Sequence, residues 1–209
     1  MTGRIVARGL YAITDEQLIP PGQLSHCVSE AVTGGATVIQ YRNKGGDARQ
    51  RQQQASALAQ LCRQHAVPLI INDDVALAAS VNADGVHLGK TDASLEQARQ
   101  QLGPQAIIGV SCYNSLERAV QAAQAGADYV AFGRFFASHS KPDARPADIA
   151  LLRQARRQLA LPIVAIGGIT ADNGGALVAA GADLLAAIHG VFGQADIQPA
   201  ARQYANLFR

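Results

Sequence analysis

The sequence predicts an α/β protein folded as a (β/α)8 barrel, with residues 1–209 forming a single domain. Three observations support this prediction. Eight short apolar segments alternate with longer amphipathic segments, and a short motif recurs before every second apolar segment. The chain length leaves about 26 residues for each of eight strand–helix units, which is short but sufficient for this fold.

The expected strands are mostly apolar at consecutive positions, as strands are when both faces of a sheet are covered. They span residues 10–14, 37–42, 68–73, 85–89, 106–111, 128–133, 162–168 and 184–190. Segments rich in Ala, Gln, Leu and Arg separate them, and these residues favour helix. Helices are expected over 24–33, 48–66, 74–81, 94–102, 115–125, 147–159, 172–180 and 196–207.

A weak internal repeat favours a closed barrel. GGAT (34–37), NAD (82–84), GAD (126–128) and GAD (181–183) each precede an even-numbered strand. Gly or Asn can end a helix in the left-handed conformation, after which the chain turns directly into the strand. A doublet of two strand–helix units repeated four times would give this pattern. The alternative is a doubly wound open sheet, which is disfavoured because no GxGxxG follows the first strand.

Composition excludes several classes of function. The net charge of +2 gives no electrostatic case for nucleic acid or anionic membranes. No apolar run approaches the roughly 18 residues of a membrane span, and the first residues do not read as a signal peptide. The three cysteines form no CxxC or metal-binding pattern, which fits a reducing cytosol. We therefore expect a cytoplasmic protein without membrane or nucleic-acid partners.

Polar residues gather at the ends of the expected strands, where barrel proteins place their working face. In chain order these are Gln40, Arg42, Asn43, Lys44, Asn72, Asp73, Asp74, Lys90, Asp92, Ser111, Ser138, Ser140, Lys141 and His189, and two glycines, Gly167 and Gly168, follow strand seven. Only three of the 18 basic residues are lysines, and each of these follows an even-numbered strand. This distribution supports a site for an anionic ligand.

Asp73 and Asp92 end neighbouring strands and offer hard oxygen ligands that suit Mg²⁺, which also binds substrate phosphates. The alternative for Asp73 or Asp74, and for Asp92, is the N-cap of the helix that follows.

Phosphate is expected at two places. Gly167 and Gly168 permit close backbone approach after strand seven, although a tight turn would also require glycine. The stretch RFFASHSKPDAR (134–145) offers two serines and Lys141 to a phosphate, whereas its composition alone favours a polar linker.

The histidines do not predict a nucleophile. His87 lies inside strand four and is expected to be a buried histidine with satisfied hydrogen bonds. His139 and His189 lie at the working face, but neither has a convincing Ser or Cys partner, so we predict no triad.

Eight segments together resemble one enzyme family. They are LYAITD, IQYRNK, IINDD, ADGVHLGKTD, IGVSC, GADYVAFGRFFASHSKPDA, PIVAIGGI and GADLLAAIHGVF. In this order, over residues 10–193, the chain resembles the thiamine-phosphate synthases, also called thiamine-phosphate pyrophosphorylases. The resemblance implies a transferase of the EC 2.5.1.3 type on a (β/α)8 barrel. It would join 4-amino-2-methyl-5-hydroxymethylpyrimidine diphosphate to 4-methyl-5-(2-phosphoethyl)thiazole, giving thiamine phosphate and diphosphate.

The resemblance also implies roles for individual residues. The residues with an implied catalytic role are Lys141, Arg42, Lys44 and Ser111. The diphosphate would be bound by Arg42, Lys44, Asn72 and Lys141, and Mg²⁺ by Asp73 and Asp92. The pyrimidine would be bound by Gln40 and Ser111, and phosphate by Ser138, Ser140, Gly168, Ile188 and His189. His189, His139 and Asn43 depart from the family pattern, since a serine, a small hydroxyl residue and an acidic residue respectively are common there.

The implied mechanism is dissociative. Magnesium and the basic side chains stabilise the departing diphosphate, and the thiazole nitrogen captures a pyrimidine carbocation without a protein nucleophile. The partners would be the two small-molecule substrates, and family members can associate as homo-oligomers. Three alternatives remain: a thiazole tautomerase of the same fold, a Schiff-base aldolase using Lys90 or Lys141, and a phosphate-ligand binder without activity.

Overall fold

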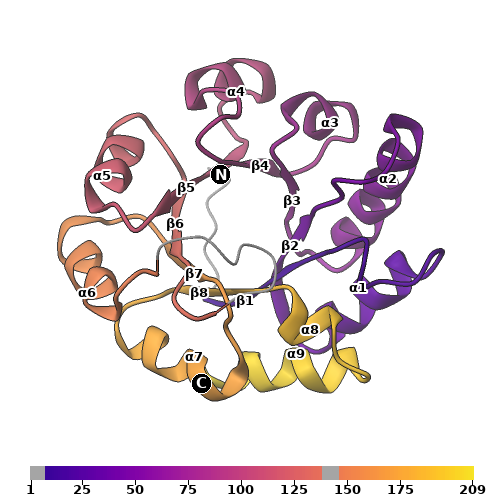
Figure 1. The fold of residues 1–209 in the computed structure, drawn as a ribbon. Coiled ribbons are helices and arrows are strands. Elements are labelled where there is room, and N and C mark those ends of the chain that lie inside the picture. Colours follow the sequence, from indigo (N-terminus) through magenta and orange to yellow (C-terminus); the bar gives the residue numbers. More distant parts are fainter. Residues whose placement is uncertain (1–7, 138–145) are drawn as a thin grey trace.

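In the computed structural model, which describes residues 8–137 and 146–209, eight parallel strands form a closed barrel in chain order, surrounded by helices (Figure 1). The strands are β1 Gly9–Ile13, β2 Ala36–Tyr41, β3 Leu69–Asn72, β4 Gly85–Leu88, β5 Ile107–Tyr113, β6 Tyr129–Gly133, β7 Ile163–Ile166 and β8 Leu184–Ala187. The helices are α1 Leu24–Thr33, α2 Ala48–Gln64, α3 Val75–Ser80, α4 Leu95–Leu102, α5 Leu116–Gln124, α6 Ile149–Gln158, α7 Ala171–Ala179, α8 His189–Phe192 and α9 Ile197–Asn206. The pairing of β1 with β8 closes the barrel and confirms the predicted fold.

The expected end of the last strand was wrong. The strand predicted over 184–190 ends at Ala187, and the short helix α8 begins at His189. The apolar run continues past the strand because Val191 and Phe192 of α8 are also buried. Apolar composition alone cannot separate a buried strand from the buried helix turn that follows it.

Alternation along the strands divides the apolar residues into two layers. In β1, Leu10 and Ala12 pack toward the helices, whereas Tyr11 and Ile13 belong to a separate cluster that fills the barrel. Tyr129 at the start of β6 belongs to this inner cluster too. Side chains at alternate strand positions therefore fill the interior up to the carboxyl ends of the strands.

The repeat found in the sequence has a structural basis at the amino ends of the strands. Three aspartates that precede even-numbered strands each accept a hydrogen bond, at 2.8 Å, from a backbone amide near the start of the preceding odd-numbered strand. The pairs are Asp84 with Leu69, Asp128 with Ile108 and Asp183 with Ile163. At the fourth position, the Thr37 hydroxyl donates to the Leu10 carbonyl at 3.2 Å. The repeat thus holds strand register at the end of the barrel where stability, not chemistry, is expected.

No helix in the described part of the chain combines the length and the apolar character that crossing a membrane requires.

Candidate active site

The main cavity, of about 340 Å³, opens among the carboxyl ends of the strands. It is lined by most of the sequence-predicted substrate residues: Gln40, Arg42, Asn72, Ser111, Gly168, Ile188 and His189. These residues come from β2, β3, β5 and the segments that follow β2, β7 and β8. Closure of the barrel therefore brings together side chains that lie up to 149 residues apart (Gln40 to His189).

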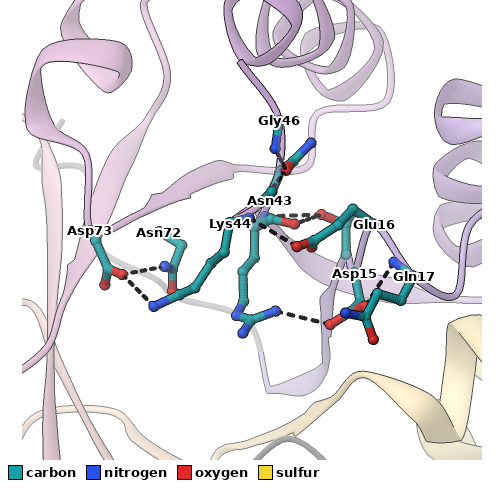
Figure 2. A network of polar contacts seen from close by, with 11 residues as sticks. Asp15, Glu16, Gln17, Asn43, Lys44, Gly46, Asn72 and Asp73 are labelled. Carbon is teal, nitrogen blue, oxygen red and sulfur yellow. Dashed lines mark hydrogen bonds and ion pairs between the residues drawn. The ribbon is translucent and has the colours of Figure 1, made fainter. Parts of the chain in front are cut away.

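A second cavity, of about 240 Å³, lies beside the first and contains one predicted cation and one of the predicted carboxylates. Lys44 and Asp73 line it, and Asn72 lines both cavities. Asn72 donates a hydrogen bond to Asp73 Oδ2 at 2.6 Å, and Lys44 Nζ lies 3.3 Å from the same oxygen (Figure 2). Among the described residues, those expected to bind diphosphate are therefore divided between two adjoining cavities.

The segment after β1 holds the two cationic residues in place. Asp15 Oδ2 accepts a hydrogen bond from the Arg42 guanidinium at 2.9 Å, and both side chains are largely buried. Glu16 accepts a hydrogen bond from the Lys44 backbone amide at 3.1 Å (Figure 2). Because Asp15 contacts one nitrogen of a group with five N–H donors, other donors of Arg42 remain for a ligand in the cavity. Asp15 and Glu16 were not among the sequence-predicted site residues.

The structure separates the roles of the neighbouring aspartates Asp73 and Asp74. Asp74 is the N-cap of α3, and its carboxylate accepts from the Leu77 amide at 2.9 Å. Asp73 takes a left-handed conformation, with φ of +63°, and its side chain lines the second cavity. The capping alternative is therefore wrong for Asp73 and correct for Asp74.

Asp92 does not cap the helix that follows it either. The N-cap of α4 is Ser94, which forms a reciprocal capping box with Gln97. Asp92 instead accepts a hydrogen bond from the Gly89 amide at 2.6 Å. Its carboxyl group is close enough to Asp73 to raise the pKa of that side chain.

This arrangement raises the pKa of Asp73. Burial is the largest cause, the adjacent Asp92 carboxyl group adds to it, and Lys44 partly offsets both. Two close carboxylates that repel each other suit a bound cation, which would relieve the repulsion. The described residues hold no group of three or more His, Cys, Asp or Glu side chains placed to bind a metal. Mg²⁺ fits such a site, since it commonly uses one or two carboxylates and completes its shell with water and substrate phosphate.

A continuous hydrogen-bonded chain crosses the inside of the barrel. Gln40 Nε2 donates to the Tyr11 hydroxyl at 2.8 Å, and Tyr11 and Tyr129 share a hydrogen bond of 2.8 Å. Tyr129 lies 2.9 Å from His87 Nδ1, and His87 Nε2 lies 2.8 Å from Ser111 Oγ. Burial raises the pKa of both tyrosines, so their hydroxyl groups stay protonated.

Sequence reasoning recognised only part of this chain. His87 has hydrogen bonds at both ring nitrogens, as expected, but it is only partly buried and it lines the main cavity, as does Tyr11. The sequence did contain a signal for this position, because His87 lies between two apolar residues of one strand. Val86 and Leu88 pack outward, so the side chain between them must face the barrel interior.

The side of the main cavity predicted to hold phosphate is built from glycines and helix starts. Gly168 has φ of +63°, and a Cβ there would come within 2.9 Å of the Phe136 Cβ. Only glycine meets both conditions without strain. Helix α7 begins three residues later and α8 begins at His189. In α7 the Asn173 amide already donates to the Thr170 hydroxyl of a capping box, so the amides that precede it are the candidate donors to a phosphate.

Some predicted residues lie outside the described part of the chain. Ser138, His139, Ser140 and Lys141 belong to the undescribed stretch 138–145. The described residues before it run beside the glycine pair, since the Phe136 amide donates to the Gly167 carbonyl at 3.0 Å. Ala137, the last described residue before this stretch, also lines the main cavity.

Comparison with known proteins agrees with this geometry. The family described as "Thiamine monophosphate synthase" matches residues 10–191. A thiamine-phosphate synthase of Nitrosococcus oceani is 53% identical over 201 residues, covering 96% of this chain and 93% of that protein. One of Methylobacillus flagellatus is 54% identical over 202 residues, covering 96% and 95%. The solved thiamine phosphate pyrophosphorylase of Pyrococcus furiosus has a TM-score of 0.87 at 37% identity, covering 95% of this chain and 94% of that one.

Proposed function

Since the chain belongs to the thiamine-phosphate synthase family, we propose that its two adjoining cavities hold the substrates of this family's reaction. The reaction joins 4-amino-2-methyl-5-hydroxymethylpyrimidine diphosphate to 4-methyl-5-(2-phosphoethyl)thiazole and releases diphosphate, so the protein is a transferase. The synthase name of relatives at about half identity over nearly the whole chain favours this activity over the tautomerase, aldolase and binding-protein alternatives.

The observation that carries the assignment of the diphosphate is the position of Asn72. It lines both cavities, with Arg42 in the first and Lys44 and Asp73 in the second. A pyrimidine ring placed near Gln40 and Ser111 in the main cavity can extend its diphosphate past Asn72 toward these cations. Arg42 and Lys44 would then meet the negative charge that develops as the carbon–oxygen bond breaks.

The coupling itself requires no protein nucleophile. The bond between the pyrimidine methylene carbon and the diphosphate oxygen breaks, and its electron pair leaves with the diphosphate. The thiazole nitrogen then donates its lone pair to the methylene carbon, which makes the new carbon–nitrogen bond. The work of the protein is to orient both rings and to stabilise the leaving group.

Asp73 and Asp92 are the residues that would hold Mg²⁺. Bound there, the ion would neutralise charge on the leaving diphosphate. Lys44 contacts Asp73 in the free protein, at 3.3 Å, and is 58% exposed. It is therefore free to move from the carboxylate to the diphosphate when the ligands arrive.

The thiazole phosphate is assigned to the glycine-rich side of the main cavity. Gly168, Ile188 and His189 would bind it through backbone amides. If so, the histidine in place of the serine common at position 189 has little effect on binding, because a backbone donor does not depend on the side chain. Ser138 and Ser140 would complete this site.

We further propose that the protein acts in the cytoplasm on small molecules, and that it can form a homo-oligomer, as members of its family do.

The direct test is a coupling assay with both substrates and Mg²⁺, in which thiamine phosphate and diphosphate should form in equal amounts. A folded protein that gives neither product with fresh substrates would refute the proposed function.

Lys141→Ala tests the predicted diphosphate contact. We expect kcat to fall by about tenfold or more, with little change in the melting temperature, because one charge-assisted contact to the leaving group is lost. Arg153→Ala is the matched control, since it removes an exposed basic side chain from α6. A Lys141→Ala protein that unfolds, or that keeps the wild-type kcat, would contradict the assignment.

A further inference from the structure

The hydrogen-bonded chain inside the barrel joins the two residues assigned to the pyrimidine through a tyrosine that does not line the cavity. Gln40 and Ser111 are its ends, and both line the main cavity. Tyr129 is its central member, is fully buried and is not among the cavity-lining residues. Its hydroxyl group can therefore influence a ligand only through its neighbours.

The strand register is arranged to let Tyr129 reach His87. His87 of β4 pairs with Gly109 of β5, and Gly109 pairs with Tyr129 of β6. A Cβ on Gly109 would collide with the Tyr129 ring. Because position 109 has no side chain, the ring passes over β5 and stacks on His87, with centroids 5.6 Å apart and planes 24° apart.

The chain of hydrogen bonds can run in one direction from Gln40 to Ser111, with the Gln40 amide as the first donor. The Gln40 amide nitrogen donates to Tyr11, so the Tyr11 hydroxyl can pass its own hydrogen to Tyr129, and Tyr129 can donate to His87 Nδ1. His87 then carries its proton on Nε2 and donates it to Ser111 Oγ. Both tyrosine hydroxyl groups stay protonated because burial raises their pKa, so neither link is lost by ionisation.

This direction determines what the two ends offer to a ligand. Gln40 has its amide nitrogen engaged and keeps its carbonyl oxygen as an acceptor. Ser111 accepts from His87 and keeps its hydroxyl hydrogen as a donor. An aminopyrimidine presents the complementary pattern, since its exocyclic amino group donates and its ring nitrogen accepts. An oxopyrimidine presents the reverse pattern, a carbonyl acceptor beside a ring N–H donor.

We propose that Tyr129 is a positioning residue for substrate specificity: it transmits a single hydrogen-bond direction from Gln40 to Ser111 and so selects the 4-aminopyrimidine over the 4-oxopyrimidine. The inference rests on the proposed function, because it takes the pyrimidine diphosphate as the ligand between Gln40 and Ser111. It adds a determinant that touches no substrate and lies at the start of β6.

The test compares the dissociation constants of the 4-amino and 4-oxo pyrimidine diphosphates by calorimetry, without the thiazole phosphate, so that no coupling occurs. The wild type should prefer the amino compound. Tyr129→Phe removes only the hydroxyl group. The preference for the amino compound should then fall by about tenfold, which corresponds to the loss of about one buried hydrogen bond. The KM for the thiazole phosphate in the coupling assay should not change. A folded Tyr129→Phe protein with unchanged preference would overturn the inference.

Tyr204→Phe is the matched control. Tyr204 is another buried tyrosine, and its hydroxyl donates to the Ile169 carbonyl at 2.7 Å, outside the chain described above. This variant should lose comparable stability and keep the amino preference. If it lost the preference to the same extent as Tyr129→Phe, a general loosening of the barrel would be the cause and the inference would fail.

A second measurement needs no variant and decides the matter if Tyr129→Phe does not fold. The ¹⁵N chemical shifts of His87 in the wild type report its tautomer, and the inference requires the proton on Nε2. A proton on Nδ1 would reverse the chain and overturn the inference. A wild type that binds neither diphosphate would count against the proposed function, whereas binding without preference would overturn only the role of Tyr129.

Discussion

At the scale of single residues, Asp73 combines two features that raise the free energy of the folded, ligand-free protein. Its backbone lies in the left-handed region, at φ of +63°. Its pKa is raised by burial and by Asp92, so ionisation at neutral pH is opposed by its surroundings. Such features persist where the surrounding structure holds them in place, and they gather at functional sites.

Asp73→Asn should therefore stabilise the ligand-free protein while it abolishes the Mg²⁺-dependent activity. Asn tolerates the left-handed conformation and carries no charge. Because the folded-state pKa of Asp73 is raised, the native protein binds this proton more tightly than the unfolded chain, and stability falls as the pH rises through the folded-state pKa. The variant's melting temperature in EDTA should exceed that of the wild type above this pH. The difference in melting temperature should narrow as the pH is lowered toward the pKa of Asp in the unfolded chain, about 3.9. A variant that melts below the wild type at alkaline pH would contradict this account.

At the scale of elements, the first residues of α3 and α4 show which side chains cap a helix and which remain for the proposed metal site. Asp74 caps α3 and Ser94 caps α4, which leaves Asp73 and Asp92 without a capping role. The sequence could not resolve this, because in each case two candidate caps lie within two residues of each other. The backbone conformation decides, since a cap must be extended while its side chain reaches the amide two or three residues later.

Ser94→Ala should consequently affect stability alone, whereas Asp92→Asn should affect the metal requirement. Loss of the Ser94 cap should lower the free energy of unfolding by about 1 kcal/mol and leave the Mg²⁺ requirement unchanged. Asp92→Asn should keep the cap and raise the Mg²⁺ concentration needed for half-maximal rate. Urea unfolding and a metal titration of the coupling rate measure the two effects. An unchanged titration for Asp92→Asn would remove Asp92 from the proposed metal site.

At the scale of the whole molecule, the two ends of the barrel have different tasks. Cavities and candidate ligands lie at the carboxyl ends of the strands, whereas the repeated aspartates lie at the amino ends. Asp128 shows how closely the amino end is held. Its backbone amide donates to the Ile108 carbonyl, its carboxylate accepts from the Ile108 amide, and Arg99 of α4 pairs with the same carboxylate at 2.6 Å.

Asp128→Ala should reduce stability without changing catalysis. It leaves the Ile108 amide and the Arg99 guanidinium without this acceptor, which should cost roughly 1–3 kcal/mol of unfolding free energy. The KM for either substrate and kcat should stay at wild-type values below the melting transition. Asp196→Ala provides the comparison, because Asp196 is exposed and its side chain makes no capping hydrogen bond. A loss of kcat in folded Asp128→Ala would show that the two ends are coupled.

The fold could be predicted because the features that specify it are local. Apolar runs, helix-forming segments and the repeated aspartates are all read from neighbouring residues. The proximity of Gln40, Arg42 and Asn72 followed from the barrel, since neighbouring strands end together. Tyr129 could not be predicted in the same way. Its partner Tyr11 is 118 residues away, and their contact depends on register and on the missing side chain of Gly109.

The hydrogen bonds from strand amides to Asp84, Asp128 and Asp183, called ties below, also divide the chain into segments, called cassettes. Each tie joins an odd-numbered strand to the even-numbered strand that follows, so β3–α3–β4, β5–α5–β6 and β7–α7–β8 each contain both partners of their own tie. A break between α4 and β5 would leave these ties within intact fragments. A break between α5 and β6 would place Ile108 and Asp128 on different pieces. New termini for circular permutation, or for a split protein that reassembles from two halves, therefore belong between the cassettes.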